Sequence, residues 1–124
     1  MPHPFNYLAG WTLILAAFLT GALIGLGFHR EAFLGGYTSF RRRLFRLGHI
    51  ALAALGALNV LYGLCPAGHG SLAPLPGPLL FAGAVAMPAV CFLSGWREGF
   101  RHLFFIPVTL LMGAVALILA QGLP

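Results

Sequence analysis

Three long stretches without a charged side chain dominate the hydrophobic pattern of this chain. They cover residues 1–29, 47–96 and 102–124, and apolar residues fill most of each stretch. A helix that crosses the hydrocarbon core of a membrane needs about 20 apolar residues. The stretches therefore accommodate one, two and one such helices, which we predict at residues 7–28, 47–64, 78–96 and 103–120.

The middle stretch divides into two helices at a segment rich in turn-forming residues. Residues 66–77 contain three prolines and three glycines, and the residue before a proline is disfavoured in a helix. Residues 50–55 do not alternate polar and apolar side chains, as the strands of a membrane barrel do. The predicted fold is all-α: a polytopic membrane protein with a bundle of four transmembrane helices, forming a single integral membrane domain over residues 1–124.

The overall composition excludes several other classes of protein. The 124 residues include seven arginines, no lysine and two glutamates, so that only 7% of residues are charged. An ordinary soluble domain has roughly 25% charged residues, and hydrophobic residues make up 60% of this chain. A soluble enzyme, a disordered chain and a disulfide-rich secreted domain are therefore excluded. The lack of lysine and the abundance of alanine, glycine, leucine and arginine indicate a bacterial genome of high GC content.

All charged residues lie in two loops, and this sets the predicted orientation. The loop after the first helix carries five arginines and one glutamate, and the loop after the third carries two arginines and one glutamate. Short loops rich in arginine remain in the cytoplasm, and two crossings separate these loops. We therefore expect a multi-pass protein of the bacterial inner (cytoplasmic) membrane, with both termini and the middle loop outside the cytoplasm.

Four arginines precede the second membrane helix: Arg41, Arg42, Arg43 and Arg46. Thr38 or Ser39 is a suitable N-cap, so we expect a helix that begins there and continues into the membrane. The arginines would then face lipid headgroups, whose anionic members attract each charge by about 1 kcal/mol, or an acidic partner subunit. Nucleic acid is not an expected partner, because four arginines without a folded basic surface are weak evidence for it.

Small residues recur along one face of each predicted helix. Helices in lipid associate through such faces, because small side chains allow the backbones to approach closely. Bulky residues such as Leu55 are expected to face the lipid instead. We predict helix packing, within the chain or against other membrane subunits or a second copy, at Gly21, Gly25, Gly56, Gly63 and Gly113.

Three histidines are expected at the cytoplasmic ends of the helices: His29, His49 and His102. Two imidazoles from facing helices of a bundle can ligate a b-type haem. His49 and His102 are the preferred pair, because each begins the small-residue face of its helix, and His29 is the reserve ligand. In the alternative interpretation these histidines are ordinary amphipathic residues at the membrane interface, or contacts of another metal or of a quinone.

Other candidate chemistry is sparse. The chain has no aspartate, and Glu31 and Glu98 lie beside arginines outside the predicted helices, which argues against proton-coupled transport. Cys65 and His69 provide two potential metal ligands in the middle loop, and His3 a third, whereas a structural zinc site needs four. No catalytic residue pattern emerges.

These features favour a small accessory or structural subunit of a larger inner-membrane complex, such as a respiratory or electron-transfer complex. The small mass outside the membrane and the helix faces suited to packing both support this hypothesis. A b-type haem protein that carries electrons through His49 and His102 is the first alternative. A passive small channel or carrier is the second.

A reporter fused to the C-terminus tests the predicted orientation. A reporter that works only outside the cytoplasm should be active when fused to the C-terminus. Both arginine loops favour the cytoplasmic side, which places the C-terminus on the opposite side. Replacing Arg41, Arg42, Arg43 and Arg46 together by glutamine should give mixed orientations, measured as loss of reporter activity. A fusion active only in the cytoplasm would contradict the orientation.

Overall fold

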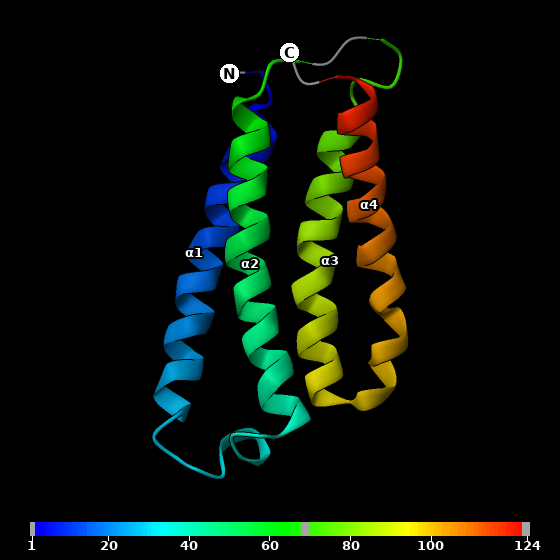
Figure 1. The fold of residues 1–124 in the computed structure, drawn as a ribbon. Coiled ribbons are helices and arrows are strands. Elements are labelled where there is room, and N and C mark those ends of the chain that lie inside the picture. Colours follow the sequence, from blue (N-terminus) through cyan, green and yellow to red (C-terminus); the bar gives the residue numbers. More distant parts are fainter. Residues whose placement is uncertain (1, 68–69, 123–124) are drawn as a thin grey trace.

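The chain forms four long helices joined in sequence order (Figure 1). The computed structural model describes residues 2–67 and 70–122. The helices are long and apolar enough to cross a membrane, if the 3-10 segment η2 is counted with α4, which confirms the predicted number of helices. The elements are α1 (Pro4–Gly27), η1 (Phe33–Gly35), α2 (Phe40–Leu64), α3 (Pro76–Trp96), η2 (Glu98–Phe104) and α4 (Phe105–Ala120).

Each helix packs against the next one along the chain. The main contacts are α1 with α2, α2 with α3 and α3 with α4, while α1 touches α3 to a smaller extent. Figure 1 shows the connection from α2 to α3 at the same end as the start of α1 and the finish of α4. The two charged connections, residues 28–39 and 97–104, lie together at the other end, which we call the arginine end.

The contact between α1 and α2 follows a regular register. Contacts recur every seven residues on both antiparallel helices, pairing Tyr7 with Gly63, Ile14 with Gly56 and Gly21 with His49. A seven-residue repeat is typical of helices that wrap around each other with interlocking side chains. One partner in each pair is glycine, so the backbones approach closely. A Cβ atom at Gly56 would lie 2.9 Å from the carbonyl oxygen of Gly10.

The centre of the molecule is a small apolar core shared by three helices. Its fully packed members come from α1, α2 and α3: Leu13, Ala17, Leu52 and Ala84. Leu55 packs against this cluster and is half-buried, so the prediction that it faces lipid is wrong.

Buried amides join three helices at the end opposite the arginines. The Asn6 side-chain nitrogen donates hydrogen bonds to the Asn59 side-chain oxygen at 2.8 Å and to the Gly77 carbonyl at 2.9 Å. Asn59 is fully buried, and its own nitrogen donates to the Leu55 carbonyl. Hydrogen bonds between side chains are a main source of helix association in lipid. This cluster therefore holds α1, α2 and the start of α3 together.

The fourth predicted helix begins differently from expectation. Instead of an α-helix from residue 103, the structure has the 3-10 segment η2 up to Phe104, and the α-helix starts at Phe105. Pro107 consequently lies in the first turn of α4, where its missing N–H removes no helical hydrogen bond. Its place in the first turn therefore makes Pro107 compatible with the start of α4, and its side chain is fully buried.

Replacing Gly56 by leucine tests the register of α1 and α2. The new side chain meets the backbone and Ile14 of α1 at about 3 Å, and overpacking of this kind typically costs about 1–3 kcal/mol. We expect a loss of that size in the free energy of unfolding, measured by titration with a denaturing detergent.

Gly25→Leu is the matched control for this exchange. A Cβ atom at Gly25 meets no described atom within 4 Å, so we expect a change of only about 0.5 kcal/mol. Equal losses in the two variants would contradict the observed register.

Candidate functional site

A tight turn shapes the arginine end between α1 and α2. The Ser39 side-chain oxygen accepts a hydrogen bond from the Arg42 backbone nitrogen at 3.1 Å and donates to the Leu34 carbonyl. Ser39 is thus the N-cap of α2, which confirms the prediction of a cap at Thr38 or Ser39. Leu34, Gly35 and Gly36 all have positive φ angles, which only glycine adopts freely. The turn brings residues 37–39 back over the start of α2.

Arg42 is the most buried of the charged side chains at this end, with 7% of its surface exposed. Its guanidinium lies 4.4 Å from the centroid of the Phe28 ring and 5.4 Å from that of Tyr37. The Arg46 guanidinium is also 5.4 Å from the Tyr37 centroid. Cations over aromatic faces are attracted by the ring electrons. Two positive groups therefore share one aromatic ring.

The hydrogen-bonding capacity of Arg42 is largely unused. Its Nε atom is buried and has no acceptor among the described residues. A buried donor without a partner costs about 1–3 kcal/mol, and more when it is charged. Burial of this side chain therefore depends on its aromatic neighbours, and its Nε donor remains unpaired among the described residues.

The remaining predicted arginines have other environments. The Arg41 Nε atom donates a hydrogen bond to the Gly95 carbonyl at 2.8 Å, which joins α2 to the end of α3. Arg43 is exposed. Gly95 also lies against the ring of Phe45. The four arginines thus divide into one that fastens helices, two that stack on aromatic rings and one exposed residue.

A groove between α1 and α2 begins at His49, about one helical turn beyond Arg46 along α2. Its volume is about 410 Å³. It opens toward the outside of the molecule, because several of the lining residues, including Phe18 and Ala53, are exposed. The lining consists of Ile14, Ala17, Phe18, Gly21, Ala22, His49 and Ala53. Only one of these side chains, the imidazole, is polar.

The His49 ring is oriented by α1. Its Nδ1 atom lies 3.4 Å from the Thr20 hydroxyl oxygen. That hydroxyl directs its hydrogen to the carbonyl of Ala16 at 2.8 Å, so it can only accept from the imidazole. A hydrogen bond between this oxygen and Nδ1 would therefore have the imidazole as its donor. The groove thus holds one polar side chain in an apolar setting.

The histidines predicted as haem ligands are not brought together. His49 faces Gly21 of α1, whereas His102 is exposed on η2, which packs against α3 and α4. His29 is exposed after the end of α1. Within residues 2–67 and 70–122, no three His, Cys, Asp or Glu side chains form a group that could hold a metal. His69 lies outside the described residues.

The predicted packing glycines fall into two groups. Gly21, Gly56 and Gly63 lie against α2 or α1 as described above. Among the described residues, nothing lies within 4 Å of a Cβ atom built on Gly25 or Gly113. These two therefore make no close contact within the chain, and a packing role for them requires a neighbouring molecule.

Two aromatic residues at the site were not singled out by the sequence. Phe28 and Tyr37 flank the connection that precedes the arginines, and both stack with Arg42. The sequence signal that could have identified them is the presence of aromatic residues close to a run of arginines. The turn at residues 34–36, which brings Tyr37 onto α2, was not apparent from composition.

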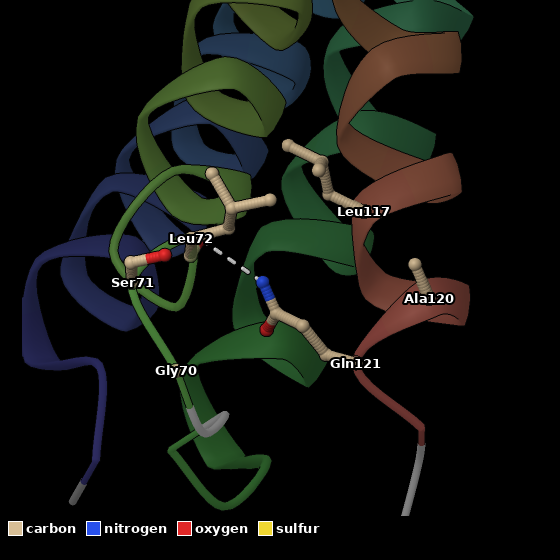
Figure 2. A pocket seen from close by; sticks show the side chains of 6 residues that line it. All are labelled: Gly70, Ser71, Leu72, Leu117, Ala120 and Gln121. Carbon is tan, nitrogen blue, oxygen red and sulfur yellow. Dashed lines mark hydrogen bonds between the residues drawn. The ribbon is translucent and has the colours of Figure 1, made fainter.

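A second cavity lies at the opposite end, between the end of α4 and residues 70–72 (Figure 2). Its volume is about 310 Å³, and none of its six lining side chains is ionisable. Figure 2 shows the side-chain nitrogen of Gln121 directed at the Leu72 carbonyl, to which it donates a hydrogen bond of 3.0 Å. This contact ties the end of α4 to the connection before α3.

Comparisons with protein-family models, with curated proteins and with solved structures gave no match to this chain.

A double-mutant cycle tests whether Gly21 makes room for the His49 ring. A Cβ atom at Gly21 would lie 2.6 Å from His49 Cε1, so Gly21→Ala should destabilise the protein by about 1–2 kcal/mol. In a His49→Ala background the clash is gone. There, the same change should be neutral or stabilising by up to about 1 kcal/mol, because alanine favours a helix over glycine.

The coupling energy from unfolding titrations of the four proteins is the measured quantity, and contacting residues typically couple by about 0.5–3 kcal/mol. Additive effects of the two substitutions would show that the histidine ring does not occupy the space above Gly21.

Proposed function

We propose that this protein is a small accessory subunit of a larger assembly in the bacterial cytoplasmic membrane. It would act through contacts between membrane helices rather than through chemistry of its own. The observation that carries this proposal is an unoccupied small-residue face on α4. A transmembrane helix of a different subunit is the proposed occupant.

The two sides of α4 differ in their contacts. Pro107 and Ala114 are buried, and Leu111 lies against Gly83 of α3. The small or short side chains at i, i+4, i+7 and i+11 lie on another face: Thr109, Gly113, Ala116 and Ala120. Three of these residues are exposed and Gly113 is half-buried.

Such a face is suited to another helix. Small residues at these spacings let two helix backbones approach closely in lipid, where dispersion contacts replace the hydrophobic effect as the source of association. The Thr109 hydroxyl already donates to carbonyls of its own helix, so burying it leaves no unpaired donor. A face of lipid-exposed leucines would gain less from a neighbour, because lipid tails contact leucine equally well.

The charge distribution supports the membrane setting and the proposed orientation. All seven arginines and both glutamates lie at the arginine end of the helices. By the positive-inside rule this end faces the cytoplasm. Haem ligation by His49 and His102 and passive conduction were the alternative hypotheses, and no observation on the described residues favours either of them.

Crosslinking in native membranes tests the proposal. Ala116→Cys places a thiol on the small-residue face of α4, in a Cys65→Ser background because Cys65 is partly exposed, whereas Cys91 is buried. With a short bifunctional thiol reagent, we expect a product that joins the 13.2 kDa chain to a different membrane polypeptide. Gly113→Leu should reduce the native mass of the assembly, because the added bulk separates the helices.

Val115→Leu is the matched control, since Val115 is 47% exposed and lies off the small-residue face. It should leave both the crosslink and the native mass unchanged. A chain that migrates alone in native membranes, or a crosslink only to a second copy of itself, would overturn the proposal.

A further inference from the structure

We infer that the arginine end of the groove between α1 and α2 is a binding site for an anionic phospholipid. Arg42 and Arg46 would hold the headgroup phosphate, and one acyl chain would lie in the groove beside His49. This inference concerns the isolated chain and does not depend on a partner at α4.

The cationic groups of the site are positioned in advance. The guanidinium groups of Arg42 and Arg46 both lie 5.4 Å from the Tyr37 ring centroid, and Phe28 holds Arg42 from a second side. Guanidinium groups present several N–H donors in a planar fork that matches a phosphate. Little side-chain freedom remains to be lost when an anion binds.

The site also lacks an internal anion. Arg42 is more than nine-tenths buried and its Nε has no acceptor among the described residues. The nearest carboxylate in the sequence, Glu31, is exposed. Two cations stacked on the same ring without a counter-ion repel each other, and at low dielectric this repulsion is weakly screened. A phosphate that contacts both guanidinium groups would offset the repulsion.

The two stacked cations and the groove share one face of α2, although no arginine lines the groove itself. Arg42, Arg46, His49 and Ala53 follow each other at spacings of four, three and four residues, which keeps them on one side of a helix. At about 1.5 Å per residue, the Cα atom of His49 lies roughly 4.5 Å further along the axis than that of Arg46. The imidazole is the polar group there that can hydrogen-bond to the lipid glycerol or headgroup.

The apolar part of the groove suits an acyl chain. Beyond His49 its walls are Ala53, Ala17 and Ile14, with Phe18 at the side. The volume of about 410 Å³ is too small for a helix. Even two helical turns, about 11 Å long and 10 Å wide, fill roughly 850 Å³. A flexible hydrocarbon chain is the occupant that fits both the size and the lack of polar groups.

Other small occupants match only half of the site. A neutral lipid or an isoprenoid quinone would fill the groove and leave the arginines without an anion. Free phosphate would neutralise the arginines and leave the groove unfilled. The combination of two stacked cations with an adjoining apolar groove therefore points to a molecule with an anionic headgroup and a hydrocarbon chain.

Native mass spectrometry of the purified full-length chain in detergent tests the inference. The probes are phosphatidylglycerol and phosphatidylcholine with identical acyl chains. We expect one phosphatidylglycerol to bind at least tenfold more tightly than phosphatidylcholine. The double variant Arg42→Gln/Arg46→Gln should lose about tenfold in affinity for phosphatidylglycerol, and Ala53→Leu should weaken its binding by filling the groove.

Two control variants separate a site from general attraction. Arg43→Gln removes a charge from an exposed arginine of the same helix turn, and Ala54→Leu adds bulk next to the groove without lining it. Both should bind phosphatidylglycerol within twofold of the unmodified chain. A loss in Arg43→Gln equal to that in Arg42→Gln, or no preference for the anionic lipid, would overturn the inference.

Further experiments identify the molecule that occupies the groove and control for folding of the variants. Competition by soluble glycerol phosphate as effective as that of the lipid would show that no chain enters the groove. Tighter binding of a quinone than of phosphatidylglycerol would assign the groove to a neutral ligand. Either result overturns the inference. Arg42→Lys keeps the charge, and it should restore most of the affinity lost in Arg42→Gln if that variant retains its helical circular dichroism.

Discussion

The close approach of α1 and α2 is the constraint on which the rest of the structure depends. At three successive seven-residue steps, one helix contributes glycine and the other a larger side chain. In lipid there is no hydrophobic gain from bringing apolar helices together, so shape and contact distance determine their association. The glycines permit backbone distances that a Cβ atom at Gly10 or Gly56 would prevent. The other helices add to this pair: α3 packs on α2, and α4 packs on α3.

Along this interface the glycine of each contact pair changes from one helix to the other, and this explains where the groove lies. At the first two steps α2 supplies the glycine, Gly63 against Tyr7 and Gly56 against Ile14, and Gly10 of α1 adds a further close contact between them. At Gly21 the order reverses, because α1 supplies the glycine and α2 the imidazole of His49. The next step pairs Phe28 with Arg42, and neither is small. The helices therefore cannot close as tightly toward the arginine end, and the groove occurs where the glycine pairing finishes.

Hydrophobic length and charge spacing were enough to predict four helices, and the serine cap of α2 followed from its position before the arginines. Helix faces were harder to predict, because glycine is so frequent that spacing alone does not select the contacting positions. Gly25 fits the same pattern as Gly21, yet only Gly21 meets a side chain. The predicted pairing of His49 and His102 required α2 and the start of the fourth helix to face each other. In the structure α4 packs on α3, and the η2 segment leaves His102 exposed. Which residues of different helices come into contact depends on the register between the helices, and the sequence of one helix alone does not determine that register.

The two ends of the molecule use polar groups in different ways, and this difference indicates where another molecule binds. Asn6 and Asn59 are neutral, and their amides hydrogen-bond to each other and to backbone carbonyls. A neutral cluster of this kind can be buried without a counter-ion. Arg42 is a guanidinium cation, and aromatic rings stabilise a cation without accepting its hydrogen bonds. The Asn6–Asn59 pair is satisfied by protein atoms, whereas a bound anion would give Arg42 the counter-ion that the described residues do not supply.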